Sequence, residues 1–158
     1  MKLTVVKEFT FDAAHHLPGY PGLCQNLHGH TYRLRIGVSG KINPDSGMVC
    51  DFVKLKNIVQ ENIIGRLDHQ CLNECKFSGF PGWLPTAENM VEWIVNLFLM
   101  KEEPILELVQ LWETPTSYCE WRKETPKYPT DVKYSGTMTG RAANLHCNFS
   151  EIEKGMAK

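Results

Sequence analysis

The order of hydrophobic periods along the chain constrains its fold more than any other feature of the sequence. Segments with period-two alternation or many β-branched residues are typical of strands, and apolar residues at three- and four-residue steps are typical of helices. The expected strands are residues 3–13, 31–39, 105–113 and 117–123, and the expected helices are one capped by Asp51 that runs to about Leu67 and one capped by Thr86. Because both helices lie between two pairs of strands, the sequence predicts an α+β fold with an antiparallel sheet.

Length and charge restrict the class of protein. A chain of 158 residues suits one domain, expected at 1–124, and the Pro-, Gly-, Thr- and Lys-rich remainder at 125–158 is expected to be a loosely structured extension. The formal net charge of −1 provides no global field for nucleic acid or an anionic membrane, and no apolar run approaches the roughly 20 residues of a membrane span. The N-terminus lacks the apolar segment of a secretory signal, so a cytoplasmic setting with reduced cysteines is expected.

Three histidines could share one metal ion. His28 and His30 are two residues apart in an extended segment, so both imidazoles project to the same side, and Gly29 leaves room between them. A hairpin-like return could bring His15, near the end of the first expected strand, alongside them. Three imidazoles with an open fourth position are typical of catalytic zinc. Surface or capping histidines are the alternative interpretation, and His16, which points the other way, is expected to face solvent.

Cys24 precedes His28 by four residues, in a loop expected at 14–30 and marked by two Pro-Gly pairs. A thiol close to a metal dication favours the thiolate form, which acts as a base or as a ligand. The common alternative for a single cysteine is a small buried hydrophobe. The composition of the loop favours the reactive interpretation and leaves open whether Cys24 contacts the metal.

Two carboxylates are candidates for chemistry. Asp68 is followed by His69 at the start of a long loop, and a carboxylate beside an imidazole can fix its tautomer. Adjacent residues rarely bond each other directly, so a different partner for Asp68 is expected. Glu113 ends an apolar strand, where its carboxylate could accept two parallel donors such as the ring N–H and exocyclic amine of a pterin or guanine. A capping Asp68, a solvated His69 and a solvent-facing Glu113 are the alternatives.

Six motifs connect these residues, and they occur in a fixed order. The motifs are FDAAHHLPG, CQNLHGH, GMVCDF, RLDHQCLN, PTAEN and WET. In this order and spacing the chain resembles the 6-pyruvoyl-tetrahydropterin synthase family over roughly residues 3–124. The spacing Cys24-x3-His28 resembles the branch of queuosine biosynthesis, whereas the pyruvoyl-forming enzymes of animals resemble Cys-x5-His. The sequence departs from that branch at Gln70-Cys71, where a second histidine is common.

The resemblance implies a fold and an assembly. The family has the tunnelling fold, or T-fold, in which a four-stranded antiparallel sheet has two helices on one side. Its members form trimers whose sheets join into a barrel, and two trimers stack into a homo-hexamer with active sites between subunits. Carried over by position, the implied zinc ligands are His15, His28 and His30. The implied catalytic base is Cys24 with the relay partners Asp68 and His69, and the implied pterin-binding residues are Glu113, Thr86 and Glu88.

The activity implied by the resemblance is that of a zinc-dependent carbon–oxygen and carbon–carbon lyase. Its substrate is 7,8-dihydroneopterin triphosphate, and its products are 6-carboxy-5,6,7,8-tetrahydropterin, acetaldehyde and triphosphate. A pyruvoyl-forming synthase, which only eliminates triphosphate, is the nearest alternative. A non-catalytic zinc- or pterin-binding scaffold is the alternative from another class, and it would not require Cys24 together with His69.

Overall fold

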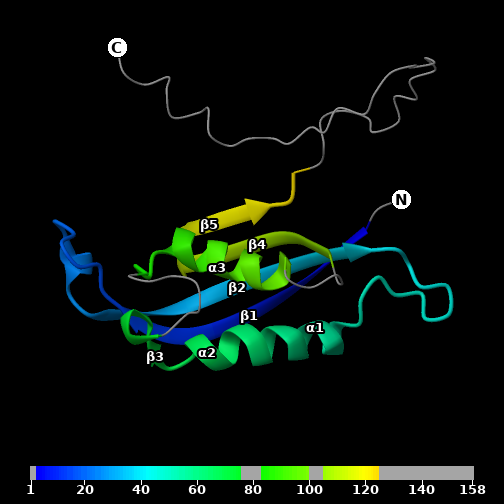
Figure 1. Cartoon of the computed structure of the whole chain (residues 1–158), viewed down its shortest axis with the longest axis horizontal. Helices are drawn as coiled ribbons and strands as arrows, with labels where there is room; N and C mark the ends of the chain where they lie inside the picture. Colours follow the sequence, from blue (N-terminus) through cyan, green and yellow to red (C-terminus); the bar gives the residue numbers. More distant parts are fainter. Residues whose placement is uncertain (1–2, 76–82, 100–104, 125–158) are drawn as a thin grey trace, which may run out of the picture. The chain divides into compact units, whose positions relative to one another are not determined.

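The computed structural model describes residues 3–75, 83–99 and 105–124. The extension predicted at 125–158 lies outside these residues. The described residues belong to the unit Met1–Glu124 and form an α+β arrangement of helices and one sheet (Figure 1). The strands are β1 (Leu3–His15), β2 (His28–Gly40), β3 (Gln70–Cys71), β4 (Ile105–Thr114) and β5 (Ser117–Arg122), in the spatial order β3-β1-β2-β4-β5. The helices are α1 (Phe52–Val59), α2 (Gly65–Leu67) and α3 (Ala87–Leu99).

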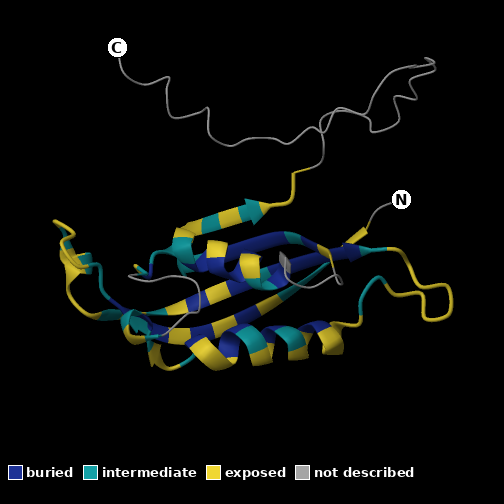
Figure 2. Cartoon of the chain, viewed as in Figure 1, coloured by how far each residue is buried: buried dark blue, intermediate teal, exposed yellow. Residues whose placement is uncertain are grey.

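The longest ladder joins β1 and β2, which have 13 residues each and pair antiparallel from Leu3↔Gly40 to His15↔His28. Directly paired residues point to the same face of a sheet, so Phe9 and Leu34 lie on one face. This face is the apolar one, and Figure 2 shows buried positions alternating with exposed ones along β1. The strands predicted at 3–13 and 31–39 are therefore confirmed, and both extend further into the loop expected at 14–30.

The four predicted strands are confirmed, but the sheet has a fifth strand that the sequence did not indicate. β3 pairs parallel to β1 through Ala13↔Gln70 and Ala14↔Cys71, within the segment expected to be a long loop. A two-residue strand is too short to produce an alternating pattern, so its pairing depends on tertiary contacts with the edge of β1. Between β2 and α1, residues 44–46 form a turn and residues 49–50 a bend.

The predicted helix after Asp51 is confirmed, with one irregular turn. The Asp51 carboxylate caps α1 by accepting a hydrogen bond from the Val53 amide at 2.7 Å. A π-helical turn at Gln60–Ile64 then joins α1 to α2. Buried side chains recur every fourth residue through this stretch, at Leu55, Val59, Ile63 and Leu67. Four-residue steps drift around an α-helix of 3.6 residues per turn, and one wider turn brings them back toward the core.

The second predicted helix is α3, and Thr86 caps it as expected. The Thr86 hydroxyl accepts a hydrogen bond from the Asn89 amide at 3.3 Å. The buried face of α3 joins that of α1 and the apolar face of the sheet in one core, which places both helices on the same side of the sheet. Among the described residues, no helix is long and apolar enough to cross a membrane.

Gly37 offers a test of how tightly β2 packs against its neighbours β1 and β4 within the sheet. A Cβ atom at Gly37 would lie 2.9 Å from the Leu108 Cβ and 3.3 Å from the Thr4 Cγ2, so Gly37→Ala forces the strands apart. We expect a loss of about 1–3 kcal/mol in the free energy of unfolding, measured by urea denaturation. Gly40→Ala on the same strand is the matched control, because its Cβ would meet Val49 at an ordinary 3.6 Å. Equal effects of the two substitutions would contradict this packing.

Candidate metal centre and active site

The apolar face of β1 and β2 ends in three histidines. Along the ladder, the pair Phe11↔Tyr32 is followed by Ala13↔His30 and then by His15↔His28, all on the same face. One ring nitrogen from each of the three histidines lies within 4.8 Å of the others. The structure thus brings together the three residues that the sequence analysis proposed as metal ligands.

Backbone carbonyls orient two of these imidazoles. The His15 Nδ1 lies 2.7 Å from the Pro85 carbonyl oxygen, and the His28 Nδ1 lies 2.8 Å from the Asn26 carbonyl oxygen. A carbonyl can only accept, so each Nδ1 carries the proton and each Nε2 presents a lone pair. The His15 Nε2 is buried and has no protein partner. Because a buried nitrogen without a partner is costly, this donor set fits a metal ion with three neutral imidazole ligands.

The electrostatics of His30 agree with this arrangement. Burial lowers the pKa of His30, and the neighbouring His15 and His28 lower it further. The neutral imidazole is the form that binds a metal. The histidine cluster therefore favours the neutral form of His30, which is the form that can bind a metal ion.

The histidines open into a cavity of about 460 Å³. Its lining comes from the end of β1, the start of β2, the first turn of α3 and the β4–β5 hairpin. The lining residues are His15, Leu17, Cys24, His28, His30, Thr86, Ala87, Glu88, Glu113, Thr114, Ser117, Tyr118 and Cys119. Seven of the nine predicted site residues thus share one cavity, and Asp68 and His69 are not among them.

Cys24 lies in a 3-10 turn, Leu23–Gln25, between β1 and β2. The Leu17 amide donates a hydrogen bond to the Cys24 carbonyl at 2.8 Å, which anchors the turn to the end of β1. The thiol is free, half-buried and part of the cavity wall. Within the described residues, the group of mutually close ligand atoms contains the three histidines and not Cys24.

Glu113 is a carboxylate in the cavity wall whose pKa is shifted by its surroundings. Burial raises the pKa of Glu113; His15 and His28 lower it, and Glu88 raises it further. In the part of the protein that the structure describes, no hydrogen bond or ion pair is formed by the Glu113 carboxylate. A half-buried carboxylate without donors is suited to accept them from a ligand.

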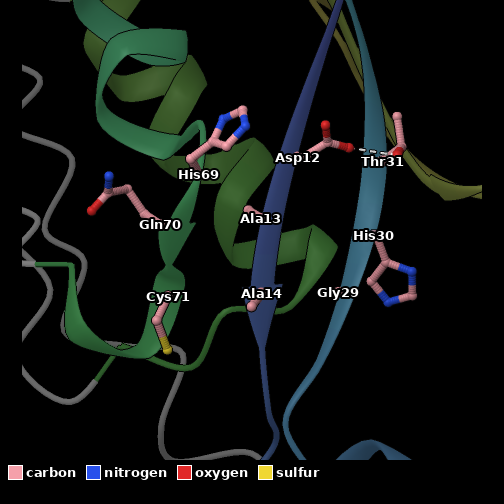
Figure 3. Close-up of a pocket in the computed structure, with 9 residues that line it drawn as sticks. All are labelled: Asp12, Ala13, Ala14, Gly29, His30, Thr31, His69, Gln70 and Cys71. Carbon is pink, nitrogen blue, oxygen red and sulfur yellow. Dashed lines mark hydrogen bonds between the residues drawn. The ribbon is translucent and has the colours of Figure 1, made fainter.

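His69, with Asp68 directly before it in the chain, lines a second hollow of about 480 Å³, which His30 also lines (Figure 3). The expectation that these neighbours do not bond each other is wrong, because the His69 Nδ1 lies 2.9 Å from the Asp68 Oδ1. The left-handed backbone of His69, with φ of 60°, turns its ring back toward the carboxylate. Asp12 holds both residues: its amide donates to Asp68 Oδ1 at 3.0 Å, and its carbonyl accepts from the His69 amide at 2.6 Å.

His69 and Cys24 line different cavities of the same protomer. In Figure 3, His69 lies on the β3 side of β1, whereas His30 extends from β2. Asp12 and Thr31, which line the hollow beside His69, alternate with the histidine-bearing positions and face the opposite side of the sheet. The hydrogen bond from the Asp12 amide is the main cause that lowers the pKa of Asp68, with His69 contributing further.

Sequence reasoning missed the aromatic and hairpin residues around the site. Tyr32 is fully buried below the histidines, and its hydroxyl has no protein partner. Burial raises the pKa of Tyr32 well above its usual range, and the charge of Glu113 adds to this effect. Tyr118 stacks on Trp112 with ring centroids 4.9 Å apart. The short connection between Glu113 and the next strand was the available signal, because a tight hairpin places the start of β5 beside the end of β4.

The fold and the histidine cluster together are those of a T-fold protein with a three-imidazole centre. The sequence model of the 6-pyruvoyl tetrahydropterin synthase family matches residues 4–124, and the chain belongs to this family. A relative from Haemophilus influenzae, named 6-carboxy-5,6,7,8-tetrahydropterin synthase, is 39% identical over an alignment of 140 positions that covers 75% of this chain and 98% of the relative.

Two further matches agree with this assignment. A Synechocystis relative with the same name is 37% identical over 117 residues, covering 72% of this chain and 88% of the relative. The structure of the Caenorhabditis elegans 6-pyruvoyl tetrahydropterin synthase matches with a TM-score of 0.68 and 27% identity, covering 78% of this chain and 97% of that one. The T-fold and the family suggested by the six motifs are therefore confirmed.

Glu113→Gln should stabilise the metal-free protein at neutral pH. A carboxyl whose pKa is raised on folding favours the protonated form, so its contribution to stability is present at low pH and is lost as pH rises through the folded pKa. We expect the variant to melt above the wild type at pH 7, with a smaller difference near pH 4, in thermal denaturation with a chelator present.

The matched control for this test is Glu120→Gln, where the expected sign is opposite. Hydrogen bonds from Arg122 and Gln110 lower the pKa of Glu120, so its ionised form stabilises the fold at neutral pH and the contribution is lost in acid. Destabilisation by both variants at pH 7 would contradict the account of Glu113.

Proposed function

We propose that this protein is a zinc-dependent 6-carboxy-5,6,7,8-tetrahydropterin synthase. Its substrate would be 7,8-dihydroneopterin triphosphate, and its products the carboxy-pterin, acetaldehyde and triphosphate. The observation that carries the proposal is the shared cavity, in which the imidazoles of His15, His28 and His30 converge beside the Cys24 thiol and the Glu113 carboxylate. Curated relatives with this name and the Cys24-x3-His28 spacing support it.

The three histidines would hold Zn²⁺ through one nitrogen each. When bound, the ion would polarise the two hydroxyls on the substrate's side arm and acidify the adjacent C–H. The protein's own contribution is to fix the imidazoles before the ion arrives. The carbonyls of Pro85 and Asn26 do so by holding the rings of His15 and His28 in the required tautomer.

Glu113 would anchor the pterin ring. Its carboxylate can accept two parallel hydrogen bonds from the ring N–H and the exocyclic amine, in the way a carboxylate accepts from arginine. Thr86 and Glu88, at the start of α3, line the same cavity and would contact the ring. A volume of about 460 Å³ suits a small ligand of this size. Fixing the ring places the C–H of the substrate's side arm near the thiolate. Such orientation lowers the activation barrier by about 7–11 kcal/mol.

Cys24 would remove a proton from the substrate's side arm as a thiolate. The proton relay through His69 and Asp68 would then come from another copy, because within one protomer His69 lines a different hollow from the one that Cys24 lines. Both outer strands of the sheet offer edges for such an assembly: β5 lies at one edge, and β3 covers only Ala13 and Ala14 of β1 at the other. We therefore propose a homo-oligomeric barrel, a hexamer of two stacked trimers, with active sites between subunits.

The runner-up function is 6-pyruvoyl-tetrahydropterin synthase, the name of the Caenorhabditis elegans protein of similar structure. It needs the same zinc, anchor and base, and differs only in stopping after triphosphate elimination. The short spacing between Cys24 and His28 favours the carboxy product, because a longer loop would bring the thiolate to the substrate from another direction.

Product analysis decides between these reactions. Purified zinc-loaded protein is incubated with 7,8-dihydroneopterin triphosphate, and the products are identified by mass. We expect a carboxy-tetrahydropterin together with acetaldehyde. A pyruvoyl-pterin without acetaldehyde would move the protein to the runner-up function, and unchanged substrate with zinc bound and the oligomer intact would favour the non-catalytic scaffold.

Cys24→Ala tests the assignment of the base. Loss of a positioned proton-transfer group should reduce turnover about 10²–10⁴-fold while zinc content and pterin binding persist. Steady-state kinetics and metal analysis measure these quantities. Cys50→Ala is the control, because Cys50 is also a half-buried free thiol but lies beside the loop between β2 and α1. Wild-type turnover in Cys24→Ala would reduce this residue to a packing role.

A further inference from the structure

His15 is the most buried of the three histidines, with only 2% of its surface exposed. It is also the last residue of β1, where strand pairing with β2 stops. Its ring is fixed on one side by the backbone that leaves β1 and on the other by the Pro85 carbonyl at 2.7 Å. The position of the His15 Nε2 therefore depends on how firmly these two backbone segments are held.

Asn73 holds the backbone directly after His15. The His16 amide donates to the Asn73 Oδ1 at 2.9 Å, and the Asn73 Nδ2 donates to the His16 carbonyl at 2.9 Å. One carboxamide thus satisfies both hydrogen-bonding groups of one residue. The last pair between β1 and β3 is Ala14↔Cys71, so the side chain of Asn73 continues the hydrogen bonding of this edge beyond the ladder. The expected solvent-facing role of His16 is accordingly wrong, since this residue is half-buried and tied to Asn73.

Asn89 holds the segment that presents the Pro85 carbonyl. Its Nδ2 donates to the Leu84 carbonyl at 2.8 Å, and the Thr86 amide donates to the same oxygen at 2.8 Å. These two bonds close a tight turn around Pro85, which has no amide of its own. The carbonyl of Pro85 is left to accept from His15. Asn89 therefore determines the position of the group that orients the His15 ring.

We propose that Asn73 and Asn89 are positioning residues for the zinc ligand His15, one acting through its backbone and the other through its carbonyl partner. The inference rests on the proposed function, because it takes the histidine cluster as the zinc site. Outer partners of metal ligands typically change metal affinity about 10–100-fold when they are removed. The two asparagines act one bond further out, so we expect an effect near the lower end of that range.

The test measures zinc dissociation constants of metal-stripped protein by competition with a chromophoric chelator. Asn73→Asp and Asn89→Asp keep the side-chain shape and replace the donating amide with an oxygen that faces a carbonyl. Each should weaken zinc binding about tenfold. The matched control is Asn62→Asp, which removes a similar bond, from the Asn62 Nδ2 to the Ile58 carbonyl at 2.7 Å, in the π-helical turn. The control should bind zinc as the wild type does.

Several outcomes are distinguishable. Wild-type protein that binds no zinc would refute the zinc site of the proposed function itself. Wild-type binding with unchanged affinity in both variants would overturn the present inference, and a lower melting temperature of the metal-free variants with unchanged affinity would show a purely structural role. Asn89→Asp places a carboxylate in the first turn of α3, where it favours the helix. If Asn73→Asp does not fold, the zinc affinity of Asn89→Asp decides alone.

Discussion

The antiparallel register of β1 and β2 is the constraint on which the rest of the structure depends. Their ladder runs without a bulge from Leu3↔Gly40 to His15↔His28. The same alternation that buries Phe11 and Tyr32 also directs the three histidines to one side. A slip by one residue would move the core residues and the histidines to the opposite face together. The burial of the apolar face therefore enforces the geometry of the candidate metal centre. The stability of the core and the arrangement of the three histidines depend on the same strand register.

Polar groups that the fold leaves without partners gather in the cavity and directly below it. The His15 Nε2 and the Tyr32 hydroxyl are buried and unpaired, and burial disfavours the ionised form of Glu113. Each unpaired buried group costs about 1–3 kcal/mol, and such groups are rare elsewhere in native proteins. Their collection at one end of an otherwise apolar core is typical of a site that a metal and a ligand complete. The core below the site, formed by both helical segments and the sheet, supplies the stability that makes this arrangement possible.

Periodicity in the sequence predicted the four long strands, both helices and their caps, because each of these is set by local alternation or by a capping residue. It also predicted that His15 approaches His28 and His30, since a hairpin return is short-range. The strand β3 could not be predicted, because two residues carry no pattern and its pairing depends on Asp12 and on the far edge of β1. The direct contact between Asp68 and His69 depends on a left-handed backbone at His69, which sequence spacing does not reveal. The placement of this pair away from Cys24 required the three-dimensional arrangement of one protomer.

Mixing two inactive variants tests most directly whether the site is completed between copies. Cys24→Ala and His69→Ala subunits are co-expressed in equal amounts, and turnover of 7,8-dihydroneopterin triphosphate is compared with each homo-oligomer. Suppose that a site combines Cys24 of one copy with His69 of a neighbour. Half of the copies are then His69→Ala subunits that still supply Cys24, and half of their neighbours are Cys24→Ala subunits that still supply His69. About a quarter of the sites are then intact, and the mixture should recover about a quarter of the wild-type turnover. Mixed oligomers that remain as inactive as either parent would contradict a shared active site.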